Sequence, residues 1–188
     1  NINLGFVIKD DEHLKECVDK YLKNESQNIL GNITFWETTN VKDMSRLFEY
    51  ERNFNTLLLW NVSNVENMKA MFVECVKFNQ PLNIWKVNNV KVMEYMFMYC
   101  KSFDQPLDKW DVSNLEEMAN MFFASINFNQ NLNSWKVSKV KDMSFLFCAC
   151  YKFNQTLDNW EIKEKIDIRN IFTATLLEKN NTFPTWYF

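Results

Sequence analysis

The chain has 188 residues, 47% hydrophobic and 24% charged, with a net charge of −3 at pH 7. Only three of its cations are Arg, so it lacks the clustered Lys and Arg of a nucleic-acid surface, and we expect no nucleic acid partner. A single His and only two Gly argue against His-based catalysis, His-rich metal sites and Gly-rich phosphate loops. No run of 18 apolar residues occurs, so no transmembrane segment is expected.

Residues 1–32 precede the regular part of the chain and are predicted to form an N-terminal cap. Residues 4–8 fit a short strand, while Leu14, Val18 and Leu22 follow helical spacing. Repeat arrays need such caps because an open end would expose their core.

Residues 33–172 contain a 25-residue repeat. The seven Trp lie 24 to 26 residues apart, at positions 36, 60, 85, 110, 135, 160 and 186. A Phe follows each of the first six Trp by twelve residues, and a Met or Ile follows each by eight. A second Phe, a Leu before the next Trp and an Asn or Asp complete the unit. Such self-similarity at a fixed period indicates a repeat architecture.

Each unit is predicted to contain a short strand and then a helix of about ten residues. Trp85 and Val87 are two residues apart and so share one face of an extended chain, whereas Met93 and Phe97 have helical spacing. Two capping boxes are expected at helix starts, Ser63 with Glu66 and Ser113 with Glu116. Because so short a helix needs neighbours, we expect an α/β fold, a right-handed β/α solenoid of about six coils with an N-terminal helical cap.

Residues 173–188 are predicted to be a partial coil that ends in a strand. Phe183 and Trp186 restore the spacing of the repeat after a segment that fits no column. A strand at the end of an array presents unpaired backbone groups. Three alternatives stay open: Pro184 and its neighbours protect this edge, the edge pairs with another chain, or the natural protein continues.

The strings WNVSNVENMKAMFVECVKFNQPL (60–82) and WDVSNLEEMANMFFASINFNQNL (110–132) resemble the repeat of BspA-type leucine-rich-repeat surface proteins. That family includes mycoplasma, algal and large DNA virus members, and the resemblance covers residues 11–172. It implies leucine-rich-repeat-like coils used for binding or display, and it supplies no catalytic residues. It favours a virion or cell-surface location over the cytoplasm.

The predicted strand face consists of the residues one before, one after and three after each Trp. Strand-lined faces of repeat proteins commonly bind partners. The alternative is that the alternating charges of its central column only stabilise neighbouring strands. From Leu59 to Glu161, the positions of this face contain no aromatic residue and no Arg, the residue types that dominate binding energy. This composition favours the alternative. The candidate partner-binding residues of this face are Asn61, Lys86, Asp111, Lys136 and Glu161.

The predicted helix side consists of the residues ten and thirteen after each Trp. Several of them are aromatic or apolar and are predicted to form a patch for a partner or for self-association. The alternative is burial between adjacent helices. The candidate residues are Val73, Tyr95, Met98, Phe123 and Phe145.

Two further columns are predicted to be internal. Cys75, Cys100 and Cys150 are expected to be buried thiols, with Cys75 and Cys100 near enough for a disulfide. The Asn or Asp after the second Phe is expected to form a ladder that satisfies backbone groups at a corner. The ladder residues are Asn55, Asn79, Asp104, Asn129 and Asn154.

The sequence therefore predicts a non-enzymatic repeat scaffold that mediates protein–protein interaction. The alternative is a structural component of a virus particle or of a cell-surface layer. No catalytic, cofactor-binding or metal-binding residue is predicted, because no column supplies the chemistry of an active site. The expected partner is another protein, and self-association is expected to use the C-terminal edge strand or the helix side.

Overall fold

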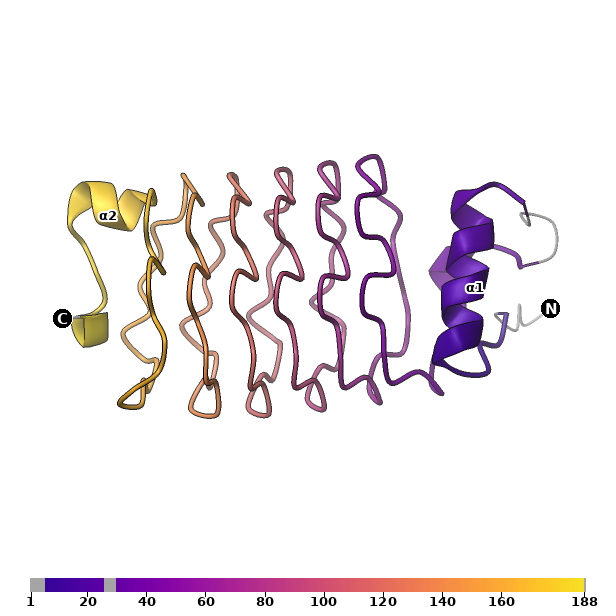
Figure 1. The fold of residues 1–188 in the computed structure, drawn as a ribbon, viewed down its shortest axis with the longest axis horizontal. Helices are drawn as coiled ribbons and strands as arrows, with labels where there is room; N and C mark the ends of the chain where they lie inside the picture. The colour runs from indigo at the N-terminus through magenta and orange to yellow at the C-terminus, as the bar shows by residue number, and fades with distance from the viewer. Residues whose placement is uncertain (1–5, 26–29, 188) are drawn as a thin grey trace.

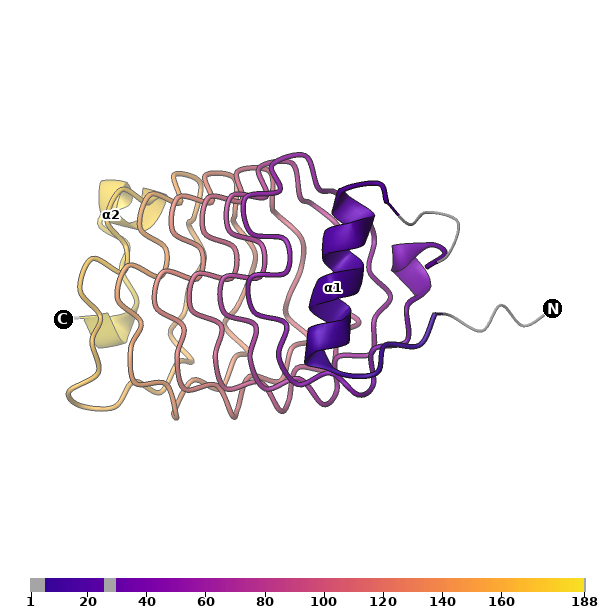
Figure 2. The same ribbon diagram turned by 45° about the vertical axis from the view of Figure 1, so that its right-hand side comes forward.

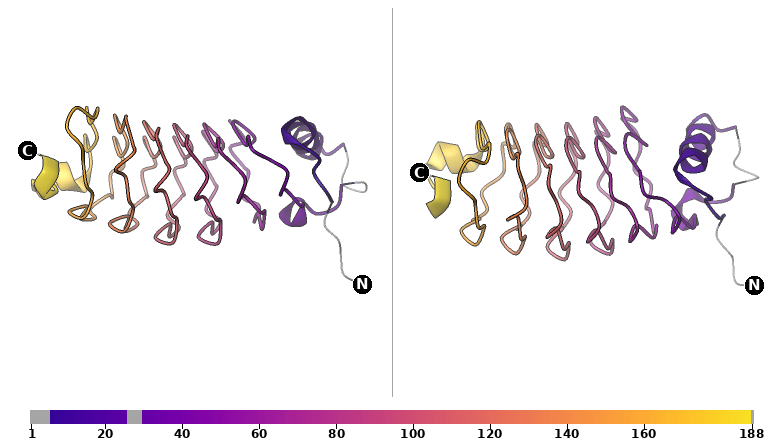
Figure 3. Two further views of the ribbon diagram at one scale, coloured as in Figure 1. Left: turned by 90° about the horizontal axis from the view of Figure 1, so that it is seen from below. Right: turned by 60° about the horizontal axis from the view of Figure 1, so that its bottom comes forward.

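The computed structural model describes residues 6–25 and 30–187. The chain forms a column of stacked loops, with α1 (Asp11–Leu22) at the N-terminal end and α2 (Leu176–Asn180) at the C-terminal end (Figure 1). We call each loop of about 25 residues a rung. Turned views show the same stack, with each rung beside the next in the sequence (Figure 2 and Figure 3).

Regular secondary structure is sparse in this column. Besides the two α-helices, the described residues form two 3₁₀ turns, η1 (Ile33–Phe35) and η2 (Thr185–Tyr187). Isolated parallel β-bridges, such as Asn67 with Val92 and Val92 with Glu117, link successive rungs. None of the described residues belongs to a continuous strand.

The predicted right-handed β/α solenoid is therefore wrong. In each rung the residue ten after Trp and the residue fourteen after Trp have positive φ, between 54° and 68°. A right-handed helix needs negative φ at every residue, so these two positions interrupt it. The residues concerned are Arg46, Tyr50, Ala70, Glu74, Tyr95, Tyr99, Asn120, Ala124, Phe145, Ala149, Asn170 and Ala174.

The left-handed residues produce consecutive turns in which alternate amides point to the next rung. The Ala70 N–H donates to the Glu94 carbonyl across the rungs (2.9 Å). The next amide, that of Met71, turns back to the Met68 carbonyl in its own rung (3.3 Å). The rungs that begin at Trp60, Trp85, Trp110 and Trp135 all repeat this alternation. Half of the amides that a helix would use internally thus join neighbouring rungs.

The predicted buried positions are nevertheless correct. Met68, Met71, Phe72 and Cys75 follow i, i+3, i+4, i+7 spacing, and all four are fully buried. The series of turns also brings every third or fourth residue inward. A helical stripe and this series of turns therefore leave the same pattern in the sequence.

Indole groups replace the predicted strand pairing beside each Trp. Trp85 and Val87 are buried and Lys86 between them is exposed, which confirms the predicted alternation. No strand ladder joins these segments within the described chain, but from Trp60 onward each indole N–H donates to the backbone carbonyl two or three residues before the preceding Trp. Examples are Trp85 Nε1 to Leu58 O (3.1 Å), Trp110 Nε1 to Leu82 O (2.9 Å) and Trp135 Nε1 to Leu107 O (3.0 Å).

Stacked phenyl rings fill the core along the length of the column. Phe97 lies 5.7 Å from Phe72 and 5.6 Å from Phe122 in the neighbouring rungs, with nearly parallel rings. Within its own rung Phe97 stacks on Phe103 at 4.2 Å. Aromatic pairs at such distances add to the stabilisation that burial alone provides.

The predicted Asn/Asp ladder is confirmed. Asn79 Oδ1 accepts from the Asp104 backbone N–H (3.0 Å) and from Gln105 Nε2 (3.1 Å). The same oxygen is used in the same way by Asn55, Asp104 and Asn129. Four of the five ladder side chains, all but Asn154, therefore satisfy a backbone amide of the next rung.

The predicted capping boxes are wrong, because no helix follows Ser63 or Ser113. The Ser63 N–H donates instead to Asn61 Oδ1 (3.1 Å), and the Ser113 N–H donates to Asp111 Oδ1 (3.1 Å). Side chains do turn this corner without glycine, but they form Asx turns rather than helix caps.

Different structures occur at the two ends of the column. The expected N-terminal helix is present as α1, which buries Leu14, Cys17 and Val18. Of the strand expected at 4–8, residues 4 and 5 lie outside the described residues, and Val7 forms an isolated bridge with Glu37. The division into 1–32, 33–172 and 173–188 stays a prediction.

The predicted C-terminal edge strand is wrong. Thr185–Tyr187 is a 3₁₀ turn, so self-association cannot use a strand there. Trp186 stacks on Trp160 at 6.2 Å, and its indole N–H donates to Leu157 O (2.8 Å). The last Trp thus continues the core and covers part of the final rung.

All five cysteines are free, including the Cys75–Cys100 pair considered for a disulfide. Cys75, Cys100 and Cys150 are buried as predicted, and the Cys100 thiol donates to Phe72 O (2.9 Å). Ser125 occupies the same column, and its hydroxyl donates to Phe97 O (2.5 Å). Burial raises the pKa of each of these three thiols.

The left-handed positions can be tested with one substitution at two alanines. Ala149 has a φ of 60°, whereas Ala119, a buried residue, is not among the positive-φ residues. We expect Ala149→Gly to leave the free energy of unfolding unchanged or raise it by up to about 1 kcal/mol, because glycine relieves the strain. We expect Ala119→Gly to lower it by about 1 kcal/mol. Urea denaturation measures both, and an equal loss in the two variants would contradict the assignment.

The cysteines are expected to differ in reactivity. Cys148 is half-buried, and its pKa is raised by burial and less by Glu178. We expect a disulfide reagent at pH 8 to modify Cys148 in the folded protein, with a rate that rises with pH as thiolate forms. Cys75, Cys100 and Cys150 should react only upon unfolding. Cys148→Ala should abolish the fast phase, and its persistence would show that one of the core thiols is accessible.

Candidate binding surfaces

The two predicted binding surfaces need names that do not imply strands or helices. The tryptophan face consists of the residues one before, one after and three after each Trp. The turn face consists of the residues nine to fourteen after each Trp and contains the predicted helix side. Consecutive rungs repeat both faces.

The five residues predicted on the tryptophan face are all exposed, one per rung. Asn61 and Asp111 are held by their Asx turns, and Asn61 Nδ2 also donates to Thr39 Oγ1 (3.1 Å). The hydrogen bonds from Ser113 lower the pKa of Asp111, with a weaker contribution from the charge of Lys136. Within the described chain no ion pair joins the alternating charges of this row.

Two further features mark the tryptophan face. A groove of about 450 Å³ lies between two rungs and includes Lys136 and Glu161 in its lining. At the other end, Phe35, Leu59 and Ile84 occupy the position before three successive Trp and are 50%, 45% and 63% exposed. Phe35 extends the apolar run of this column into the first rung.

The turn face is partly apolar. Of the predicted residues, Val73 is buried, whereas Tyr95, Met98, Phe123 and Phe145 are half-buried. Burial between helices is wrong as an explanation, because the rungs contain no helices there. The rings instead contact one another across the rungs, Tyr99 with Phe123 (5.5 Å) and Phe123 with Phe145 (6.5 Å), both edge to face.

A groove of about 260 Å³ lies beside these rings. Val73, Ala70 and Met98 contribute to its lining, together with Tyr50 and Tyr99. The two tyrosines lie fourteen residues after a Trp, a column that sequence reasoning did not single out. The sequence signal for this column is the recurrence of Tyr fourteen residues after a Trp, at positions 50 and 99.

The cations of the turn face are all paired with carboxylates. Arg46 lies 2.9 Å from Glu49, Lys69 2.5 Å from Glu94, and Arg169 2.6 Å from Asp167. Lys69 Nζ also lies 5.7 Å from the centre of the Tyr95 ring. The face is therefore close to electrically neutral around its apolar groove.

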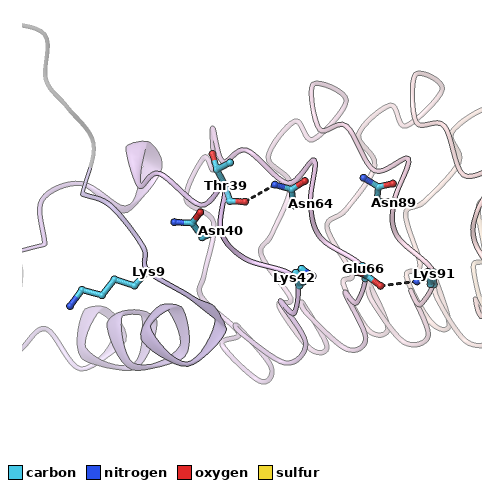
Figure 4. A pocket seen from close by; sticks show the side chains of 8 residues that line it. All are labelled: Lys9, Thr39, Asn40, Lys42, Asn64, Glu66, Asn89 and Lys91. Carbon is cyan, nitrogen blue, oxygen red and sulfur yellow. Dashed lines mark hydrogen bonds and ion pairs between the residues drawn. The ribbon is translucent and has the colours of Figure 1, made fainter.

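A third surface, which we call the corner trough, was not identified from the sequence. Its volume is about 600 Å³, and two rows of side chains cross the first rungs along it (Figure 4). One row holds Asn residues four after Trp, and the other holds charged residues six after Trp. The lining residues are Lys9, Thr39, Asn40, Lys42, Asn64, Glu66, Asn89 and Lys91.

An ion pair joins two residues of the charged row. Glu66 lies 2.7 Å from Lys91, and this contact lowers the pKa of Glu66 and raises that of Lys91. Glu116 and Lys141 pair in the same way further along the row. The alternation of charge in this column is the sequence signal that would have indicated the trough.

Metal-binding clusters and long apolar helices are absent from the described residues. They contain no group of three or more His, Cys, Asp or Glu that could hold a metal ion. No helix in this part of the chain has the length and apolar character needed to cross a membrane.

A family model described as "Mycoplasma protein of unknown function, DUF285" matches the chain twice, over residues 17–124 and 93–186. No curated protein and no solved structure matches it. The two matches overlap and together include every Trp of the repeat. The chain therefore belongs to the repeat family described as Mycoplasma protein of unknown function, DUF285.

Proposed function

We propose that this chain is a non-enzymatic repeat scaffold that binds another protein through its turn face. The observation that carries the proposal is the cluster of half-buried rings formed by Tyr99, Phe123 and Phe145, together with Tyr95, which lines the same groove as Tyr99. Aromatic residues supply a large share of the binding energy at protein interfaces. The tryptophan face offers no such cluster beyond Phe35.

The backbone beneath the rings supports this proposal. Tyr95 N–H donates to Ala119 O (3.1 Å), and Phe145 N–H donates to Arg169 O (2.9 Å), so both residues are anchored to the next rung. A surface whose backbone is already fixed loses little conformational entropy when a partner binds. The neutral charge of the face favours a partner that contributes an apolar side chain to the groove over Val73.

The resemblance to BspA-type leucine-rich-repeat surface proteins is part of the same proposal. It rests on the W-x-V-S-N-V-x-x-M-x-x-M-F string of residues 60–72, and it implies binding or display rather than catalysis. The structural-component alternative predicts self-assembly instead of capture of a different protein.

The test is the double variant Tyr95→Ser/Phe145→Ser. The matched control, Lys86→Ser/Lys136→Ser, changes two exposed residues of the tryptophan face. A partner captured from cells of the source organism and then purified should bind wild type and control equally, and it should bind the turn-face variant at least about tenfold more weakly. Binding is measured by surface plasmon resonance, after circular dichroism has shown that the variants are folded.

Two results would contradict the proposal. Unchanged binding by the turn-face variant, with loss in the control, would move the binding site to the tryptophan face. Assembly of the pure protein into multimers in the ultracentrifuge, abolished by the turn-face substitutions, would favour the structural-component alternative.

A further inference from the structure

The corner trough concentrates positive charge on a chain whose net charge is negative. Its lining holds three Lys and one Glu, whereas the whole chain has a net charge of −3. Glu66 pairs with Lys91, which leaves the ammonium groups of Lys9 and Lys42. Both lysines are exposed, and no ion pair to either occurs in the described chain. The carboxylate of Asp11 near Lys42 is already used by the backbone amides of residues 42 and 43.

The Asn row of the trough has fixed orientations. Asn64 Nδ2 donates to Thr39 O (2.8 Å), and Asn89 Nδ2 donates to Ser63 O (2.7 Å). Because the amide nitrogen faces the preceding rung, the Oδ1 oxygen of each side chain lies on the side away from that rung (Figure 4). No hydrogen bond to either Oδ1 is formed by the described residues.

The next rung shows what such an oxygen binds. Asn114 has the same position four residues after Trp, and its Nδ2 donates to Asn88 O (2.8 Å). Its Oδ1 accepts from Lys139 Nζ (2.6 Å). For Asn64 and Asn89, the residue at that place in the following rung is Asn instead of Lys. A hydroxyl or amine donor from a ligand can therefore take the place of the Lys139 ammonium.

These groups define the chemistry of a ligand. It must bring hydrogen-bond donors to a row of Asn oxygens and carboxylates to the nearby Lys9 and Lys42. All eight lining side chains are polar, and the trough offers none of the apolar anchors that protein partners use. Rungs linked by parallel bridges repeat at about 4.8 Å, which is close to the length of one sugar ring in a polysaccharide.

We propose that the corner trough binds a carboxylated polysaccharide, with sugar hydroxyl groups on Asn64 and Asn89 and separate sugar carboxylates at Lys42 and at Lys9. The turn face, where we propose that a protein binds, consists of other residues. The two sites are independent, and one can fail without the other.

The experiment titrates the protein with a hyaluronan hexasaccharide, whose alternate sugars carry carboxylates, by isothermal titration calorimetry at low salt. A neutral N-acetylglucosamine hexamer and an Asp/Ser decapeptide serve as comparison probes. We expect binding of hyaluronan alone. Lys42→Gln should weaken it about tenfold, as the loss of one charge-assisted hydrogen bond does. Lys77→Gln, a matched change at an exposed lysine outside the trough, should leave it unaltered.

A second pair of variants separates binding from stability. Asn89→Ser and Asn114→Ser each remove one Asn hydrogen bond to the preceding rung, but only Asn89 lines the trough. Asn114→Ser also removes the hydrogen bond from Lys139, so its melting temperature should fall at least as far as that of Asn89→Ser, while only Asn89→Ser should weaken hyaluronan binding. Absence of hyaluronan binding, equal affinity in all four variants, or tighter binding of the decapeptide than of hyaluronan would each overturn the proposal.

Discussion

The hydrogen bonds between rungs are the constraint on which the rest of this structure depends. Four amides of a rung, those of Met68, Ala70, Phe72 and Glu74, donate to carbonyls of the next rung. They can do so only because the residues ten and fourteen after Trp are left-handed. Each such residue costs about 1–2 kcal/mol. Each hydrogen bond contributes about 1 kcal/mol, so four bonds offset two strained residues.

Because these bonds cross between rungs, a rung has little reason to fold alone. The same dependence holds for the indole N–H groups from Trp60 onward, each of which donates to a carbonyl just before the preceding Trp. It also holds for the stacked rings of Phe72, Phe97 and Phe122. Every contact of this kind requires the next unit to arrive in register. A nearly constant Trp spacing of 24 to 26 residues is the sequence expression of that requirement.

Sequence reasoning identified the repeat, the buried columns and the Asn ladder, but not the backbone conformation. Met68, Met71 and Phe72 have helical spacing, and that spacing cannot distinguish a helix from successive turns that bury the same residues. The left-handed positions carry Tyr95, Phe145 and Ala149 rather than glycine, so the usual sequence marker of positive φ is absent. The five candidates on the tryptophan face are exposed, as the alternation beside Trp implies. The corner trough could not be predicted in the same way, because residues of several neighbouring rungs line it.

The same arrangement separates the columns that build the rungs from those that can recognise ligands. The indole N–H of Trp110 and the thiol of Cys100 donate to backbone carbonyls of neighbouring rungs, and the Asn79 oxygen accepts from the Asp104 N–H and from Gln105 Nε2. In Asn89 only the amide nitrogen forms such a bond, to the Ser63 carbonyl, and no described residue donates a hydrogen bond to its Oδ1. A side chain that uses its nitrogen in the fold and keeps its oxygen free has a fixed orientation and can still accept a hydrogen bond from a ligand. For this reason oriented polar recognition in this stack is expected at columns like that of Asn64 and Asn89, with the long, solvated lysines beside them contributing charge.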